Sequence, residues 1–121
     1  FKAVRATNLV LQELNAAEMP ESKRQQLIAE ARFIRAFHYF NLVKRYGGVP
    51  IVTEVQQYTG PEDLYGLQVS RDKEQEVWDF ILTELPVNLW KEPVPLDMRL
   101  MRCNLVRHCM RHRSLNTAKC N

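Results

Sequence analysis

A long and almost uniformly apolar helix is the feature of the sequence that most constrains the fold. Between residues 27 and 43 five side chains are polar, and they fall mostly three apart: Glu30, Arg32, Arg35, His38 and Asn41. A helix with so narrow a polar stripe packs against neighbours on several sides. We therefore predict a helix over about residues 21–45 that forms the buried centre of a helical protein.

Two shorter helices are predicted on either side of it. Val4, Leu11 and Leu14 share one face of a helix expected over about residues 2–17. The third helix is expected to start at Ser70, a good N-cap residue, and to end before Pro86. Its apolar stripe is Val77, Trp78, Ile81, Leu82 and Leu85.

The connections between these helices complete the fold prediction. Gly47-Gly48 supplies the permissive backbone of a helix end, and residues 53–69 are expected to form a long, ordered surface loop. The order helix, helix, loop, helix predicts an all-α fold, compatible with tetratricopeptide-like helix pairs in part of a larger helical solenoid. No strict repeat of about 34 residues is visible, so periodicity alone does not establish that architecture.

Composition divides the 121-residue chain near Pro86. Residues 1–85 hold 10 Lys and Arg against 12 Asp and Glu, a net charge of −2, whereas residues 86–121 hold 7 against 2, a net charge of +5. All three cysteines and two of the three histidines lie in the second part. We therefore treat residues 1–85 as a helical region and residues 86–121 as a basic tail rich in Cys, His and Met.

Three blocks of the first part carry a family resemblance. The run from Ala29 to Pro50 contains Glu-Ala-Arg-Phe-Ile-Arg-Ala, then aromatic residues, then Tyr-Gly-Gly-Val-Pro. Together with the Arg-Ala-Thr-Asn block at residues 5–8 and the Ser-Arg-Asp-Lys block at residues 70–73, it closely resembles SusD/RagB-like proteins. The three blocks stand in the family's order, and members of that family are several-fold longer than this chain.

The resemblance implies a fold, a role and a location. It implies tetratricopeptide-like helix pairs with loops that bind glycans, as part of a non-enzymatic nutrient-binding lipoprotein. It also implies the bacterial outer membrane, at the cell surface, with a lipid anchor that lies outside this chain. The implied partners are a glycan or oligosaccharide and a TonB-dependent transporter. No cofactor is implied.

The residues themselves identify few candidate contacts. Tyr58 and Tyr65 on the loop are the best candidates for stacking on a sugar, because sugars present apolar faces to aromatic rings. Trp78 lies at core spacing, and Arg32 and Arg35 are expected to make structural ion pairs within the helical core. No Gly-rich phosphate loop, nucleophile elbow or His-Glu-x-x-His motif occurs, so nothing favours catalysis.

The tail admits several interpretations. Cys103, Cys109, His112 and Cys120 are the alternative set for a zinc site, but their spacing lacks the paired Cys-x2-Cys of common structural sites. The abrupt change of composition favours a tail that is disordered, or translated out of frame from about residue 86. A basic nucleic-acid-binding module is the remaining alternative, although no aromatic residues are interleaved for base stacking.

Two further expectations concern the chain as a whole. A helical-repeat adaptor that binds a protein partner is the alternative to a nutrient-binding component. The apolar faces of the second helix exceed what two short neighbours can cover. We therefore expect the chain to expose an apolar patch and to self-associate, not to form a compact monomer.

Overall fold

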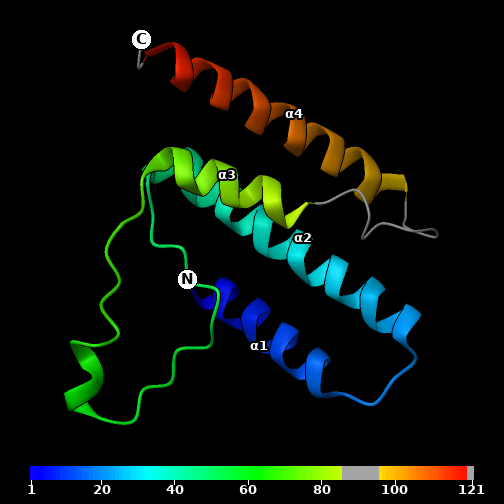
Figure 1. Cartoon of the computed structure of the whole chain (residues 1–121), viewed down its shortest axis with the longest axis vertical. Coiled ribbons are helices and arrows are strands. Elements are labelled where there is room, and N and C mark those ends of the chain that lie inside the picture. The colour runs from blue at the N-terminus through cyan, green and yellow to red at the C-terminus, as the bar shows by residue number, and fades with distance from the viewer. Residues whose placement is uncertain (86–95, 120–121) are drawn as a thin grey trace.

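The structure is a computed structural model that describes residues 1–85 and 96–119, without the side chains of residues 96–99, 102 and 113–119. Every regular element in these ranges is helical: α1 (Lys2–Ala16), α2 (Glu21–Tyr46), the 3-10 turn η1 (Pro61–Leu64), α3 (Glu74–Glu84) and α4 (Leu96–Lys119). The α-helices run antiparallel in sequence order, and α2 packs against both α1 and α3 (Figure 1). None of the described helices is long and apolar enough to cross a membrane. The predicted all-α class is confirmed.

The ends of α1 and α2 agree with the sequence pattern to within one residue, but the start of α3 does not. Ser70 is exposed and lies outside the helix, which begins at Glu74. The backbone N–H of Lys73 instead donates to Glu76 Oε2 at 2.8 Å. An acidic residue inside the first turn therefore accepts the hydrogen bond of the N-cap N–H group. The expectation that Ser70 caps this helix was therefore wrong.

The two glycines after α2 have different roles. Gly47 adopts φ +69°, a left-handed conformation that favours glycine, and its N–H donates to the Val43 carbonyl at 2.9 Å. Gly48 lies against the end of the loop that leads into α3. A Cβ atom on Gly48 would stand 2.2 Å from the Asp72 carbonyl oxygen. The Gly-Gly pair therefore ends the helix and also lets two backbone segments approach closely.

The core lies where α2 meets α1, α3 and α4. Ala36, Tyr39, Val77 and Ile81 are fully buried, and Trp78 is 1% exposed, which confirms its predicted place in the core. The expectation that α2 is packed nearly all round is only partly confirmed. One face stays open, because Ile34 is 45% and Phe37 is 38% exposed.

The second part of the chain differs from the disordered tail that we favoured, because residues 96–119 form α4. Leu105 and Cys109, four residues apart, join the hydrophobic core, and the His112 ring stacks on Trp78 with 4.8 Å between centroids. This short apolar stripe is the physical reason for a packed helix. Residues 86–95, where the composition changes, lie outside the described residues. The out-of-frame hypothesis stays a prediction that the nucleotide sequence across this junction tests.

Candidate functional site

A long loop between α2 and α3 is clamped at its base. Residues 47–73 leave α2, run out to η1 and return to the start of α3 (Figure 1). The Arg71 guanidinium donates to the Gly48 and Tyr46 carbonyls, both at 2.9 Å. The Ile51 N–H donates to Asp72 Oδ2 at 2.7 Å. These bonds join the two ends of the loop, so its base is a closed and ordered structure.

The outgoing arm of the loop is also attached to two helices. From α1, Asn8 Nδ2 donates to the Val52 and Glu54 carbonyls at 2.9 and 3.2 Å. From α2, the Tyr39 hydroxyl accepts the Val52 N–H at 2.7 Å. Burial raises the pKa of Tyr39, so the hydroxyl keeps the proton that it donates to the carbonyls of this arm. The arm is therefore fixed relative to the helical core.

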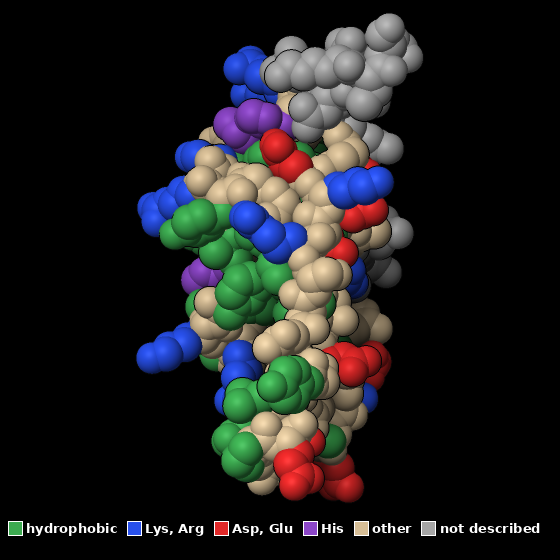
Figure 2. Space-filling model, turned by 90° about the vertical axis from the view of Figure 1, so that its left-hand side faces the viewer, with side chains coloured by type: hydrophobic (Ala, Val, Ile, Leu, Met, Phe, Trp, Pro, Cys, Tyr) green, Lys and Arg blue, Asp and Glu red, His purple; other side chains and the backbone are tan. Residues whose placement is uncertain are grey.

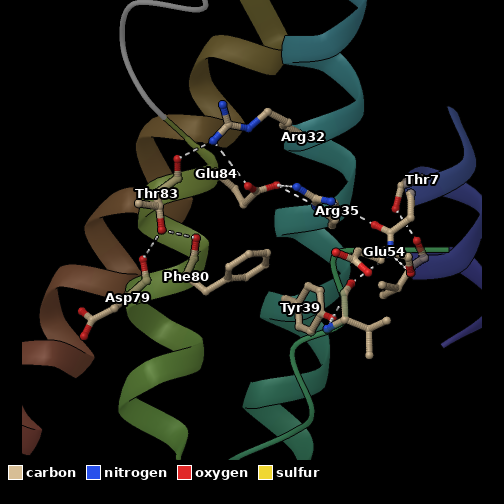
Figure 3. A network of polar contacts seen from close by, with 12 residues as sticks. Thr7, Arg32, Arg35, Tyr39, Glu54, Asp79, Phe80, Thr83 and Glu84 are labelled. Atoms are coloured by element: carbon tan, nitrogen blue, oxygen red, sulfur yellow. Dashed lines mark hydrogen bonds and ion pairs between the residues drawn. The ribbon is translucent and has the colours of Figure 1, made fainter. Parts of the chain in front are cut away.

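A buried polar network extends this attachment across three helices (Figure 3). Arg35 Nη1 donates to Asn8 Oδ1 at 2.9 Å, while Arg35 Nε and Nη2 both lie 2.7 Å from Glu84 Oε2. Arg32 Nη2 lies 3.3 Å from Glu84 Oε1 and donates to the Thr83 carbonyl at 2.8 Å. The predicted structural role of both arginines is confirmed. Because two arginines engage the Glu84 carboxylate, Glu84 is not a free general base.

The tip of the loop is held by its own hydrogen bonds. The hydroxyl and backbone N–H of Thr59 both donate to Asp63 Oδ2. The Asp63 N–H donates to the Gly60 carbonyl at 3.1 Å, and the Leu67 N–H donates to the Asp63 carbonyl at 3.0 Å. This small motif orders η1 through hydrogen bonds within the loop itself.

The two tyrosines singled out from the sequence lie on either side of η1. Tyr58 is 60% and Tyr65 is 84% exposed, and Leu64 beside them is 53% exposed. Within the part of the chain that the structure describes, neither tyrosine ring packs on another aromatic ring. Figure 2 shows hydrophobic and acidic side chains side by side at the lower end of the molecule, where the loop lies. Both rings are thus available to a ligand, and their contact with one stays a prediction.

A separate groove of about 400 Å³ lies between the start of α1 and the two arms of the loop. Its walls are largely apolar, and polar side chains at its edge come from Lys2, Arg5, Glu54 and Gln56. Neither Tyr58 nor Tyr65 lines it. The structure therefore separates the loop tyrosines from this groove.

Three of the four alternative zinc ligands lie within the described residues, and their surroundings differ. Cys103 is exposed, Cys109 is fully buried and His112 stacks on Trp78, while Cys120 lies outside the described residues. Among the residues whose side chains are described, no three His, Cys, Asp or Glu gather to hold a metal ion. The i, i+4 spacing of His108 and His112 places their ring centroids 4.6 Å apart. Both rings pack on Trp78 of α3, and His108 also packs on Phe40 of α2.

Cys109 provides a test of how α4 packs. Burial raises the pKa of its thiol to about 12, from 9.0, which lowers the reactive thiolate fraction near pH 8 by about a thousandfold. We expect a maleimide to label Cys103 readily and Cys109 only after denaturation. The measurement is labelling in a Cys120→Ser background, with Cys103→Ser and Cys109→Ser variants to assign each thiol. Equal labelling rates in the native protein would show that α4 is not docked on α3.

The sequence pattern did not single out Asn8, Asp72 or Glu84, which hold the loop and the helices together. Asn8 is 3% exposed on the packed side of α1, so a polar residue beside Val4 and Leu11 was the available signal. Asp72 lies before α3, two residues after Ser70, where that helix was expected to start. Their partners lie far away along the chain, and spacing does not reveal such pairs.

Comparison with known proteins agrees with the resemblance of the motifs. A family model of SusD-like proteins, described as starch-binding and associating with the outer membrane, matches residues 1–96. A SusD-like protein from Bacteroides fragilis NCTC 9343 matches in structure, with a TM-score of 0.60 and 34% sequence identity. That match covers 68% of this chain and 15% of the solved chain. Among curated proteins, none matches.

Proposed function

Because this chain belongs to the family of SusD-like proteins, we propose that it is part of a non-enzymatic glycan-binding component of a bacterial outer-membrane uptake system. The observation that carries the proposal is the family match over residues 1–96, which includes α1, α2, the loop and α3. The chain spans 15% of the length of the solved relative, so the role of the whole protein is inferred from its family.

The geometry supports binding through a fixed loop. Asn8, Tyr39 and Arg71 hold the base and outgoing arm, and Thr59 and Asp63 order the tip. A loop that is ordered before binding loses less conformational entropy when a ligand arrives. Exposed tyrosine rings then offer flat apolar faces to sugar C–H groups, with hydroxyls free to hydrogen-bond. Binding of this kind needs no activated nucleophile.

The remaining parts of the proposal rest on the resemblance. We interpret α1 and α2 as one tetratricopeptide-like helix pair, with α3 as the first helix of the next pair. The proposed partner is a TonB-dependent transporter, and the proposed location is the cell surface, through a lipid anchor outside this chain. The adaptor and nucleic-acid alternatives have no support equal to the family match.

Retention by soluble starch in a native gel tests the binding proposal on the whole chain. We expect wild-type protein to be retarded by starch, and the Tyr58→Ala/Tyr65→Ala variant to bind about 30-fold more weakly. That factor corresponds to two rings at about 1 kcal/mol each. Tyr46→Ala is the matched control, because Tyr46 is 62% exposed at the end of α2 and lies outside the loop tip.

The possible outcomes distinguish the proposal of glycan binding from the assignment of Tyr58 and Tyr65 as contact residues. Retention that the tyrosine variant leaves unchanged contradicts the assignment of Tyr58 and Tyr65, while the binding function stands. Absence of retention by starch, xylan and pectin alike contradicts glycan binding by this part of the protein.

A further inference from the structure

Asn8 forms hydrogen bonds in two directions from the middle of α1. Its Oδ1 accepts a hydrogen bond from Arg35 Nη1 at 2.9 Å. Its Nδ2 donates to the Val52 and Glu54 carbonyls at 2.9 and 3.2 Å. The residue is 3% exposed, so little water competes for these partners. The side chain therefore joins a charged residue of α2 to the outgoing arm of the loop.

The chemistry of these partners favours an amide at position 8. A guanidinium group only donates hydrogen bonds, and a backbone carbonyl only accepts them. A carboxylate of the same size would accept from Arg35 but would repel the two carbonyls, and an aliphatic side chain would satisfy neither side. A buried polar group that loses its partner is costly. Arg35 therefore sets the orientation of the Asn8 amide, with its NH2 group directed at the loop.

The position of Arg35 depends in turn on α3. Its Nε and Nη2 lie 2.7 Å from Glu84 Oε2, and the remaining nitrogen, Nη1, faces Asn8. Because the guanidinium is planar and rigid, its pair with Glu84 fixes the direction of the Nη1 bond. Figure 3 shows Arg35 between Glu84 on one side and the loop residue Glu54 on the other. The ion pair between α2 and α3 is thus linked to the loop through Asn8.

Val52 is the residue at which these contacts reach the loop. Its carbonyl accepts from Asn8 of α1, and its N–H donates to the Tyr39 hydroxyl of α2 at 2.7 Å. Side chains of two helices thus satisfy both backbone polar groups of this one loop residue. The same arm continues from Val52 to Tyr58 at the loop tip. The position of Val52 therefore decides where the arm leaves the core on its way to the tip.

We propose that Asn8 is a positioning residue, which places the outgoing arm relative to the Arg35–Glu84 ion pair and so fixes the loop tip for its ligand. Its role in binding rests on the proposed function, in which Tyr58 and Tyr65 contact a glycan. Asn8 acts through the arm, because an arm that is already ordered loses less conformational entropy when the ligand binds. Order in the loop is then coupled to closure of the buried ion pair.

Native-state hydrogen exchange at the Val52 amide measures this attachment without any ligand. Asn8→Asp keeps an acceptor for Arg35 but removes the donors to the arm. It is expected to speed exchange at Val52 about tenfold, and at Ile81 of α3 much less. Arg35→Lys keeps a positive charge beside Glu84 but loses the planar fork, and should speed exchange at Val52 about threefold. Added to Asn8→Asp, it should have little further effect, because the link is already broken.

Starch binding by the full chain tests whether the attachment contributes to affinity. Asn8→Asp is expected to weaken retention by starch about tenfold, although Tyr58 and Tyr65 are unchanged. Leu14→Ala is the control for general destabilisation, because Leu14 is buried near the other end of α1. Asn15→Asp makes the same chemical change as Asn8→Asp at an exposed position of the same helix. Both controls are expected to bind starch as the wild type does.

Failure of the positioning role and failure of glycan binding give different results. Exchange at Val52 that Asn8→Asp leaves unchanged overturns the positioning role, whatever the affinity for starch. So does exchange that responds to Asn8→Asp but not to Arg35→Lys, or starch binding that Asn8→Asp weakens no more than Leu14→Ala does. A wild-type chain that no glycan retains contradicts the proposed function, whereas faster exchange in both variants still supports the coupling of the loop to the ion pair.

Discussion

Replacing Glu84 with alanine is expected to lower the free energy of unfolding by about 3–5 kcal/mol, the usual cost of removing one partner from a buried ion pair. The Glu84 side chain is 6% exposed and accepts contacts from two arginines, of which Arg35 is 9% exposed. Without the carboxylate, the Arg35 guanidinium keeps its positive charge where little water can reach it. Urea unfolding followed by circular dichroism measures the loss, at one fixed protein concentration.

Two variants show whether burial is the cause. Glu21→Ala removes a carboxylate that is 63% exposed from the surface pair with Arg24, and should change stability by less than about 0.5 kcal/mol. The double variant Arg35→Met/Glu84→Leu removes both charges, and should cost less than Glu84→Ala alone. If Glu84→Ala costs no more than Glu21→Ala, the network does not contribute to stability as we infer.

Replacing Gly48 with alanine is expected to destabilise the protein by about 3 kcal/mol, at the upper end of the range for an added methyl group in a packed site. The new Cβ would stand 2.2 Å from the Asp72 carbonyl oxygen and 3.2 Å from the Glu74 backbone nitrogen. Both are backbone atoms at the start of α3, and neither can rotate away as a side chain would. The clash therefore separates the two ends of the loop, where Arg71 and Asp72 now bind the residues after α2.

Gly60→Ala is the matched control for this prediction, because no atom lies within 4 Å of a Cβ at that position. Its backbone is extended, with φ 173°, so alanine adopts it without strain. Stability should change little, whereas Gly48→Ala should also speed amide exchange at Ile51 by weakening its bond to Asp72. Equal effects of the two substitutions would mean that the close approach at Gly48 is not a constraint.

Local patterns predicted much of the fold and little of what holds the loop. The apolar run of α2, the Gly-Gly stop and the spacing of Val77, Trp78 and Ile81 each reflect contacts within one helix turn or one face. Patterns of this kind involve residues close together in the chain, so they can be recognised in the sequence alone. The predicted start of α3 was wrong because the N-cap is Lys73, not Ser70. The Glu76 carboxylate accepts the backbone N–H of Lys73, and the helix begins at the next residue.

The Arg35–Glu84 and Asn8–Val52 contacts join residues 49 and 44 positions apart. A buried arginine in α2 predicts that some partner exists, but the partner is chosen by the way α1, α3 and the loop are packed around it. The placing of Tyr58 and Tyr65 is an intermediate case. Their loop was predicted from Gly60-Pro61 and Gly66, yet their exposure depends on where η1 lies.

The sequence by itself determined the family, the all-α class and the three helices of residues 1–85, because each depends on short motifs or on side-chain periodicity. Only the tertiary structure decided that Glu84 and Asn8 bind the same arginine, that Gly48 lies against Asp72, and that one face of α2 stays open. These features depend on distances between segments far apart in the chain. The apolar run of α2 is visible in the sequence, but only packing separates its buried face from the open face that carries Ile34 and Phe37.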